Sequence, residues 1–528
     1  MTESPSKRSV PDAIRDAVSL MKSGRLEDAA TLAHEICASH PTSVDAHLLA
    51  SQVQQRLGHF DAMLKMAEQA SAIDEKNLNA KFRLLECLLY CGRADRVLDE
   101  LASLEAGAKS DPRLLVQLAE YYAHCVDHEA ARRCYRKASK LDPDNAEYLF
   151  GLASSEIAHG DMDTAERLLN RVIEIAPHDY DAYRNRATLR RQRHDDNHID
   201  ELLQRLKAGV QRPAGEVQLC FALAKEYEDL HEDDVAFDWL RRGADKRRSL
   251  LKYRVDGDLA VLARLQRVFD RTMMDRDVAG CADKGPVFVI GLPRSGTTLI
   301  DRILGSHSLV TSLGEINDFA YSLMHTLNTA GTKLELIDLS ADIDFAALGR
   351  RYVQGTNNYR KTSPYLIDKT PLNYLYVGLI RLALPNARIV HIKRNPMDSC
   401  YGMYRTLFRA GYPFSYDLDD LGKYYIAYRE LMDHWGAVAP DAFLDVSYEE
   451  LVDNQETVSR RIIEYCELDW EPACLDFHKN SSAVATASSA QVRRPVYRDA
   501  LQRWRRYEKQ LQPLADQLRA AGIDILAD

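Results

Sequence analysis

The chain has 528 residues, of which 46% are hydrophobic and 28% charged, with a formal net charge of -10. This balance is typical of a soluble protein with two to four domains, and the acidic charge argues against general nucleic-acid binding. No apolar run is long enough to predict a membrane span, and the first residues lack the apolar stretch of a signal peptide. The 10 cysteines show no paired spacing, so we expect free thiols in a reducing, cytoplasmic compartment.

A period of 34 residues runs through the first part of the chain. Four glycines and one valine stand at this spacing: Gly24, Gly58, Gly92, Val126 and Gly160. Glycine suits a turn between two helices, and the prolines found 17 residues after three of these positions would end the second helix of a unit. The pattern resembles the tetratricopeptide repeat. We therefore expect five units over residues 10–178, stacked into an all-α solenoid.

Residues 179–280 are predicted to form a further helical, repeat-like region and linker. A helix pair is expected over residues 220–240, where apolar residues recur at helical spacing. Solenoids commonly present a concave surface to a peptide or protein, so the repeats are expected to bind a partner or a protein acceptor. A spacer or a dimerisation surface is the alternative.

From residue 285 to residue 528 short apolar runs alternate with helical stretches, which predicts an α/β domain with a parallel sheet. The expected strands are Val287–Ile290, Leu309–Leu313, Tyr365–Ile367, Arg388–Ile392 and Ala442–Val446, and the expected helices include Thr298–Leu304 and Leu372–Ala383. Ligands of such sheets bind at the carboxyl ends of the strands. Charged residues follow the first four strands: Arg294, Glu315, Lys369 and Arg394.

The turn after the first predicted strand is the most informative segment. Gly291 and Gly296 have the spacing of the phosphate loop G-x-x-x-x-G-K-[ST]. Thr297 stands at the lysine position, and Arg294 supplies the charge instead. Glycines let backbone N–H groups approach an anion, and a helix N-terminus favours negative charge. The segment is therefore predicted to bind phosphate, but not in the manner of an ordinary ATPase.

Three motifs together carry a family resemblance: residues 293–299 (PRSGTTL), the pair Gly314-Glu315, and residues 393–399 (KRNPMDS). They resemble sulfotransferases that use 3'-phosphoadenosine 5'-phosphosulfate (PAPS), in particular tyrosylprotein sulfotransferases and bacterial proteins that join tetratricopeptide repeats to such a domain. The resemblance covers about residues 285–515 and extends through the repeats. It implies a P-loop-like fold and transfer of a sulfuryl group from PAPS to an acceptor hydroxyl, without a metal.

The resemblance also implies roles for individual residues. The 5'-phosphosulfate would be held by Arg294, Ser295, Gly296, Thr297 and Thr298. Glu315 would act as the general base for the acceptor hydroxyl. Lys369 would stabilise the transferring group, whose departing phosphate needs cations and N–H donors.

Arg394 matches the arginine that binds the 3'-phosphate of PAPS, for which a fork of N–H donors is well suited. The family usually has a serine eight residues later, where this chain has Gly402. Ser399, one helical turn away, is the expected substitute. Tyr448 matches a tyrosine near the adenosine, with a role in the core as the alternative.

The C-terminal segment resembles the family's flap over the nucleotide. Gln491, Val492 and Arg494 lie in this flap, and Ser488 falls on a serine that stabilises the transition state. Arg503 falls on a basic residue that contacts the nucleotide. A solvated basic helix is the alternative for this arginine-rich stretch.

Two other functions remain open at this point. A phosphotransferase with a variant loop would need a magnesium ligand, and neither that nor the loop lysine is evident. A scaffold with a nucleotide-binding but catalytically weak domain is supported by Gly402 alone. The acceptor is undecided between a protein tyrosine, a carbohydrate hydroxyl and a small molecule. No clustered His, Cys and Asp pattern predicts a metal site.

Overall fold

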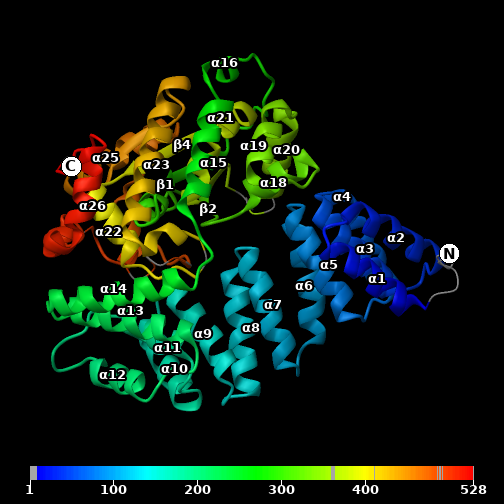
Figure 1. Ribbon diagram of the computed structural model, residues 1–528, viewed down its shortest axis with the longest axis horizontal. Helices are drawn as coiled ribbons and strands as arrows, with labels where there is room; N and C mark the ends of the chain where they lie inside the picture. The colour runs from blue at the N-terminus through cyan, green and yellow to red at the C-terminus, as the bar shows by residue number, and fades with distance from the viewer. Residues whose placement is uncertain are drawn as a thin grey trace.

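The computed structural model describes residues 9–357, 359, 363–409, 411–484, 486, 489, 491–496 and 498–526. It has the expected class, a helical region followed by a domain built on a parallel sheet (Figure 1). The α-helical solenoid curves beneath that domain, from α1 on the right of the view to α14 at the lower left. Within the described ranges, no helix has the length and apolar character needed to cross a membrane.

Antiparallel helix pairs occupy the five expected repeats, which we call the repeat array. They are α1 (Val10–Lys22) and α2 (Leu26–Ser39), α3 (Val44–Leu57) and α4 (Phe60–Ile73), α5 (Leu78–Tyr90) and α6 (Ala94–Gly107), α7 (Pro112–His124) and α8 (His128–Leu141), α9 (Ala146–His159) and α10 (Met162–Ile175). The five residues at the 34-residue spacing lie in the turns inside these pairs, and all five have positive φ.

The helical region continues beyond the array and shares a core with the sheet. It contains α11 (Tyr180–Thr188), α12 (Ile199–Lys207), α13 (Pro213–Asp229), α14 (Asp233–Ser249), α15 (Val255–Val268) and α16 (Arg271–Met274), with α13 and α14 as the expected extra pair. Phe221, Phe237 and Phe269 of this region belong to the same buried cluster as Phe288 and Trp435. The apolar core is therefore continuous across residue 285, the start proposed for the sheet domain.

The sheet has five parallel strands in the order β2-β3-β1-β4-β5. They are β1 (Pro286–Gly291), β2 (Val310–Ser312), β3 (Tyr365–Asp368), β4 (Arg388–Lys393) and β5 (Leu444–Ser447), each overlapping its predicted strand. In β1, Val287 and Val289 pack in one core cluster, and Phe288 and Ile290 pack in another. Because helices cover both faces, β1 is apolar throughout rather than alternating.

The helices of the sheet domain lie between and after these strands. They are α17 (Thr297–Leu304), α18 (Asp318–Leu327), α19 (Lys333–Leu339), α20 (Phe345–Asn357), α21 (Val377–Ala383), α22 (Pro396–Tyr404), α23 (Leu418–Val438), α24 (Tyr448–Asp453), α25 (Gln455–Tyr465) and α26 (Glu508–Ala520). The single helix predicted over Leu372–Ala383 is wrong in part, since Pro371–Tyr376 forms a 3-10 helix before α21. The Tyr374 carbonyl accepts a hydrogen bond from the Trp435 indole instead of continuing an α-helical ladder.

Turns of the repeat array contact the sheet domain at Gly58, Gly92 and Gly160. At Gly58 an added Cβ would lie 2.5 Å from the carbonyl carbon of Thr329, and at Gly160 it would collide with the side chain of Arg493. The Arg493 guanidinium also donates to the carbonyl of Ala158 at 2.8 Å. These turns therefore require glycine for close approach as well as for positive φ. The periodic glycines thus occupy the turns, and three of them, Gly58, Gly92 and Gly160, also lie at the contact between the two parts of the chain.

Candidate functional site

The predicted site residues gather where the parallel strands end. Arg294 and Thr297 follow β1, Glu315 follows β2, and Lys369 is the first residue after β3. Arg394 and Tyr448 are likewise the first residues after β4 and β5. Because the strands are parallel, these positions share one edge of the sheet. The strand ends thus bring the separate sequence motifs together.

The loop after β1 has the shape of an anion cradle. Its backbone passes through positive φ at Gly291 (149°), Arg294 (68°) and Gly296 (111°), and Gly296 precedes the first turn of α17. At Gly291 an added Cβ would lie 2.6 Å from the carbonyl of Ile392. Ser295, Thr297 and Thr298 are buried, and the Ser295 hydroxyl donates to the carbonyl of Leu292 at 2.7 Å. The loop can therefore direct backbone N–H groups at an anion from the start of a helix.

Arg394 joins three of the predicted segments. Its guanidinium lies over the ring of Tyr448, 4.6 Å from the centroid, and donates to the carbonyl of Arg294 at 3.0 Å. It also donates to the carbonyl of Ala500 in the C-terminal segment. Tyr448 in turn fills the space beside Gly296, where an added Cβ would lie 2.5 Å from its ring. Arginine, tyrosine and phosphate loop thus form one packed group.

Glu315 and Lys369 form a direct ion pair. Lys369 Nζ donates to Glu315 Oε1 at 2.5 Å. The lysine side chain is 1% exposed, whereas the glutamate side chain is 47% exposed. A buried ammonium needs a partner, and here that partner is a carboxylate that solvent can still reach. The glutamate is therefore held in place while one side stays open to an incoming group.

The loops that carry this pair are fixed to one another. The backbone N–H of Lys369 donates to the carbonyl of Gly314 at 2.9 Å. The Thr370 hydroxyl accepts from the N–H of Ile316 at 3.1 Å and donates to its carbonyl at 2.8 Å. Glu315 is thus flanked on both sides by hydrogen bonds to the neighbouring loop, which fixes its backbone.

Asp301 supports the same region, although the sequence motifs did not identify it as a site residue. It is a buried residue of α17 whose carboxylate accepts from the Ser312 hydroxyl at 2.5 Å, and that hydroxyl accepts from the N–H of Gly314 at 3.1 Å. Burial raises the pKa of Asp301, and the nearby ammonium of Lys369 opposes this rise. The only sequence signal is an acidic residue inside a short, otherwise buried helix.

The missing serine position has a packing explanation. Gly402 lies in α22, and an added Cβ there would be 3.3 Å from the Cβ of Arg294. That separation is tighter than an ordinary van der Waals contact, so a larger residue would press on the phosphate loop. Ser399 is buried in the same helix, one turn earlier.

The C-terminal segment is only partly placed at the site. Ser488 lies outside the described residues, and of Gln491 only the backbone is described, as the start of a short 3-10 helix. Val492 is buried and Arg494 is exposed. The segment continues to Ala500, whose carbonyl contacts Arg394.

Arg503 has a structural partner in the helical region. Its guanidinium pairs with the carboxylate of Glu228 in α13, with N–O distances of 3.0 and 2.8 Å. The same carboxylate also pairs with Arg405 at 2.9 Å and accepts from the Tyr401 hydroxyl at 2.8 Å. Asp398 adds a second anchor, because its carboxylate accepts from the N–H groups of Gln502 and Trp504. Arg503 thus attaches this segment to the helical region, and its contact with the nucleotide stays a prediction.

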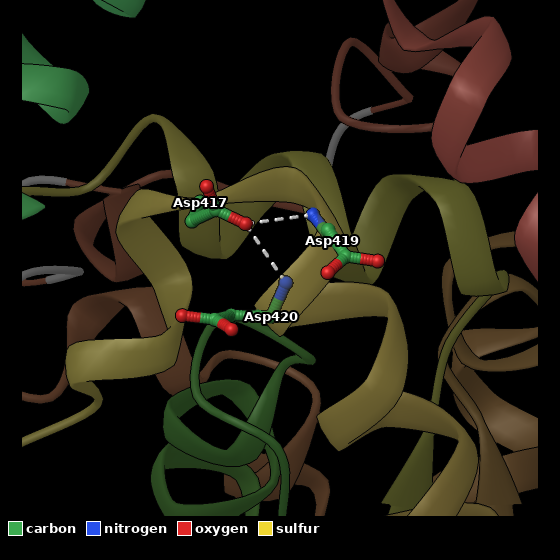
Figure 2. Close-up of side chains that lie close together, drawn as sticks. All are labelled: Asp417, Asp419 and Asp420. Carbon is green, nitrogen blue, oxygen red and sulfur yellow. Dashed lines mark hydrogen bonds between the residues drawn. The ribbon is translucent and has the colours of Figure 1, made fainter. Parts of the chain in front are cut away.

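One acidic group within the described residues is close enough to share an ion: Asp417, Asp419 and Asp420 (Figure 2). Asp417 caps α23 by accepting from the N–H groups of the other two at 2.9 Å, as the dashed lines show. Asp420 pairs with Arg248 of α14 at 2.9 Å, and Asp419 pairs with Lys423 at 2.6 Å. These carboxylates start a helix and join it to α14.

Comparison with known proteins agrees with this geometry. Residues 286–472 match a family model described as "Sulfotransferase family", and residues 127–192 match "Tetratricopeptide repeat". A protein of Aquifex aeolicus (strain VF5), itself uncharacterized, is 28% identical over 84% of this chain and 60% of its own length. The protein-tyrosine sulfotransferase of Drosophila melanogaster is 24% identical over 41% of this chain and 46% of its own length. The matches thus span less than two thirds of either relative.

Among solved structures, the sulfotransferase domain from the curacin biosynthetic pathway aligns with a TM-score of 0.32 and 16% identity, over 46% of this chain and 99% of that domain. One match lies within the helical region and the other includes all five strands of the sheet and the phosphate loop. The chain therefore joins a helical region that matches the tetratricopeptide-repeat model to a sheet domain that matches the sulfotransferase-family model.

Proposed function

We propose that the chain transfers a sulfuryl group from PAPS to an acceptor hydroxyl, with Glu315 as the general base. The observation that carries this proposal is the Glu315–Lys369 pair, which lies at the same sheet edge as the phosphate loop. A base and a cation at one strand-end edge match the needs of the reaction, in which the hydroxyl must lose a proton and the departing phosphate must be stabilised.

The residues at this edge of the sheet have the donors and the aromatic ring needed to bind PAPS. The phosphate loop offers backbone donors at Gly296, Thr297 and Thr298 and the charge of Arg294, while the N–H of Ser295 donates to the carbonyl of Leu292 at 3.2 Å. Nε of Arg394 is buried and has no hydrogen-bond partner in the described part of the chain. This donor is available for the 3'-phosphate, and the ring of Tyr448 beside it can border the adenosine. PAPS, once bound, supplies the sulfuryl group and a phosphate leaving group.

Glu315 and Lys369 have separate roles in the proposed reaction. The exposed side of the glutamate takes the proton of the acceptor hydroxyl. The ammonium of Lys369, held beside that carboxylate, stabilises negative charge on the transferring oxygens. The hydrogen bonds of Thr370 to Ile316 keep the carboxylate in place through the reaction. Ser488 is proposed to add a hydroxyl donor to the same charge.

We further propose a tyrosine in a protein as the acceptor. Three observations support it: similarity to proteins named protein-tyrosine sulfotransferase, the attached repeats, and the exposed face of Glu315. Carbohydrate and small-molecule hydroxyls are the alternatives. The alternative of a scaffold with a catalytically weak domain rests on Gly402 alone, where an added Cβ would lie 3.3 Å from the Cβ of Arg294.

A transfer screen tests the proposal. The full-length chain is incubated with labelled PAPS and a panel of tyrosine peptides, sugars and phenols, and transfer to at least one acceptor is expected. Calorimetry with PAP (3'-phosphoadenosine 5'-phosphate), AMP and ATP with magnesium is run in parallel. PAP should bind most tightly, and a preference for ATP with magnesium would instead indicate a phosphotransferase.

A further inference from the structure

The turn of the fourth repeat differs from the other four. Gly24, Gly58, Gly92 and Gly160 occupy their turns in the left-handed region, and Val126 adopts the same conformation with φ 60°. A β-branched residue is rare there, because its side chain crowds the backbone. The turn would be formed more easily by glycine, so the valine side chain must be explained by what it contacts.

The Val126 side chain reaches the loop that carries Glu315. It packs, together with Tyr359, on a small cluster of three buried residues: Leu313, Ile316 and Leu366. Two of these residues directly flank Gly314 and Glu315 in sequence. This cluster therefore connects the repeat array to the base proposed for the reaction.

The equivalent turns have other neighbours. An added Cβ would meet Thr329 at Gly58, Gly355 at Gly92 and Arg493 at Gly160, and nothing within 4 Å at Gly24. Val126 is the one residue of the five that has an apolar side chain, and this side chain packs on the Glu315 loop. The neighbours found at the four glycine turns lie elsewhere or are absent. The departure from the repeat pattern coincides with a contact to the loop that carries Glu315.

We propose that Val126 is a positioning residue for Glu315, through which the repeat array holds the loop of the general base. The loop is tied to the sheet by the N–H of Leu313, which donates to the carbonyl of Ile367 at 2.9 Å, and by Thr370. Val126 packs against the apolar side chains of the same loop. The chemical consequence rests on the proposed function, whereas the packing consequence does not.

A reciprocal pair of substitutions in the full-length chain tests this role. Val126→Gly restores the repeat pattern and relieves the backbone, but removes the contact. Gly24→Val creates the same strained turn where nothing lies within 4 Å. Amide hydrogen exchange over residues 311–317 should become at least about threefold faster in Val126→Gly and stay unchanged in Gly24→Val. Unchanged exchange in Val126→Gly, or an equal increase in both variants, would overturn the proposal.

Kinetics with labelled PAPS and a tyrosine peptide supply the second readout. Val126→Gly should lower kcat roughly tenfold, since small displacements of a catalytic group are costly, while the Kd for PAP stays unchanged. Val126→Leu keeps apolar bulk without the β-branch and should restore kcat. An unaltered kcat in Val126→Gly contradicts the role. If wild type transferred no sulfate at all, the proposed function would fail, and the exchange comparison would still decide whether Val126 holds the loop.

Discussion

Glu228 joins the helical region to the segment beside the phosphate loop, and its substitution gives a quantitative test of the structure. The carboxylate is 4% exposed and pairs with Arg405, the residue that follows α22, and with Arg503 of the C-terminal segment. Burial alone would raise the pKa of Glu228, but the two guanidinium groups outweigh it and lower the pKa to about 2. The folded chain therefore strongly favours the ionised form.

The size of the effect follows from this shift. The pKa falls from 4.5 to about 2, and each unit corresponds to about 1.4 kcal/mol, so ionised Glu228 contributes about 3 kcal/mol to the free energy of unfolding. Because the folded-state pKa is the lower one, this stability is present above pH 4.5 and is lost as the pH falls through about 2. Glu228→Gln should therefore cost about 3 kcal/mol at pH 7.

Urea denaturation followed by tryptophan fluorescence measures this cost at pH 7 and at several values down to pH 3. The difference between wild type and Glu228→Gln should shrink as the pH falls. Glu216→Gln is the matched control, since Glu216 lies on the same helix and pairs with Arg242 at the surface, where a loss of less than about 1 kcal/mol is expected. A loss at Glu228 as small as at Glu216, or one independent of pH, would mean that the ion pairs of Glu228 do not supply this stability.

Three further substitutions test which residues bind the nucleotide and which stabilise the fold around it. Arg394→Ala should weaken PAP binding by about 10- to 100-fold and AMP binding much less, because Arg394 is assigned to the 3'-phosphate; equal losses would contradict that assignment. Gly402→Ser should weaken PAP binding several-fold, since its Cβ would press on Arg294, and tighter binding would instead mean that the serine hydroxyl was the missing contact. Arg503→Met should lower the urea midpoint but leave the Kd for PAP within about twofold, because Arg503 pairs with Glu228. A tenfold weaker Kd would instead indicate that Arg503 contacts the nucleotide.

Local patterns made much of the fold predictable. The 34-residue spacing predicted the five helix pairs, because a turn with positive φ selects glycine wherever it recurs. Strands were predictable because buried parallel strands are continuously apolar, and a parallel sheet places its strand ends at one edge. That is why Arg294, Glu315, Lys369 and Arg394 could be expected to lie together.

Contacts between distant segments were not predictable. Glu228 and Arg503 are far apart in sequence, and nothing in either neighbourhood indicates the other. The position of Arg503 in the family motif predicted a contact with the nucleotide but gave no sign of its ion pair with Glu228. Val126 could be recognised as a gap in the repeat, but its reason is a cluster in the other half of the chain.

The rate of labelled sulfate transfer from PAPS by wild type and by Glu315→Gln measures most directly whether Glu315 is the base of the proposed sulfuryl transfer. We expect kcat to fall by about 10²- to 10⁴-fold in the variant, while calorimetry shows the same Kd for PAP. A variant that retains the wild-type rate, or a wild type that binds PAP but transfers sulfate to no acceptor, would contradict the proposal.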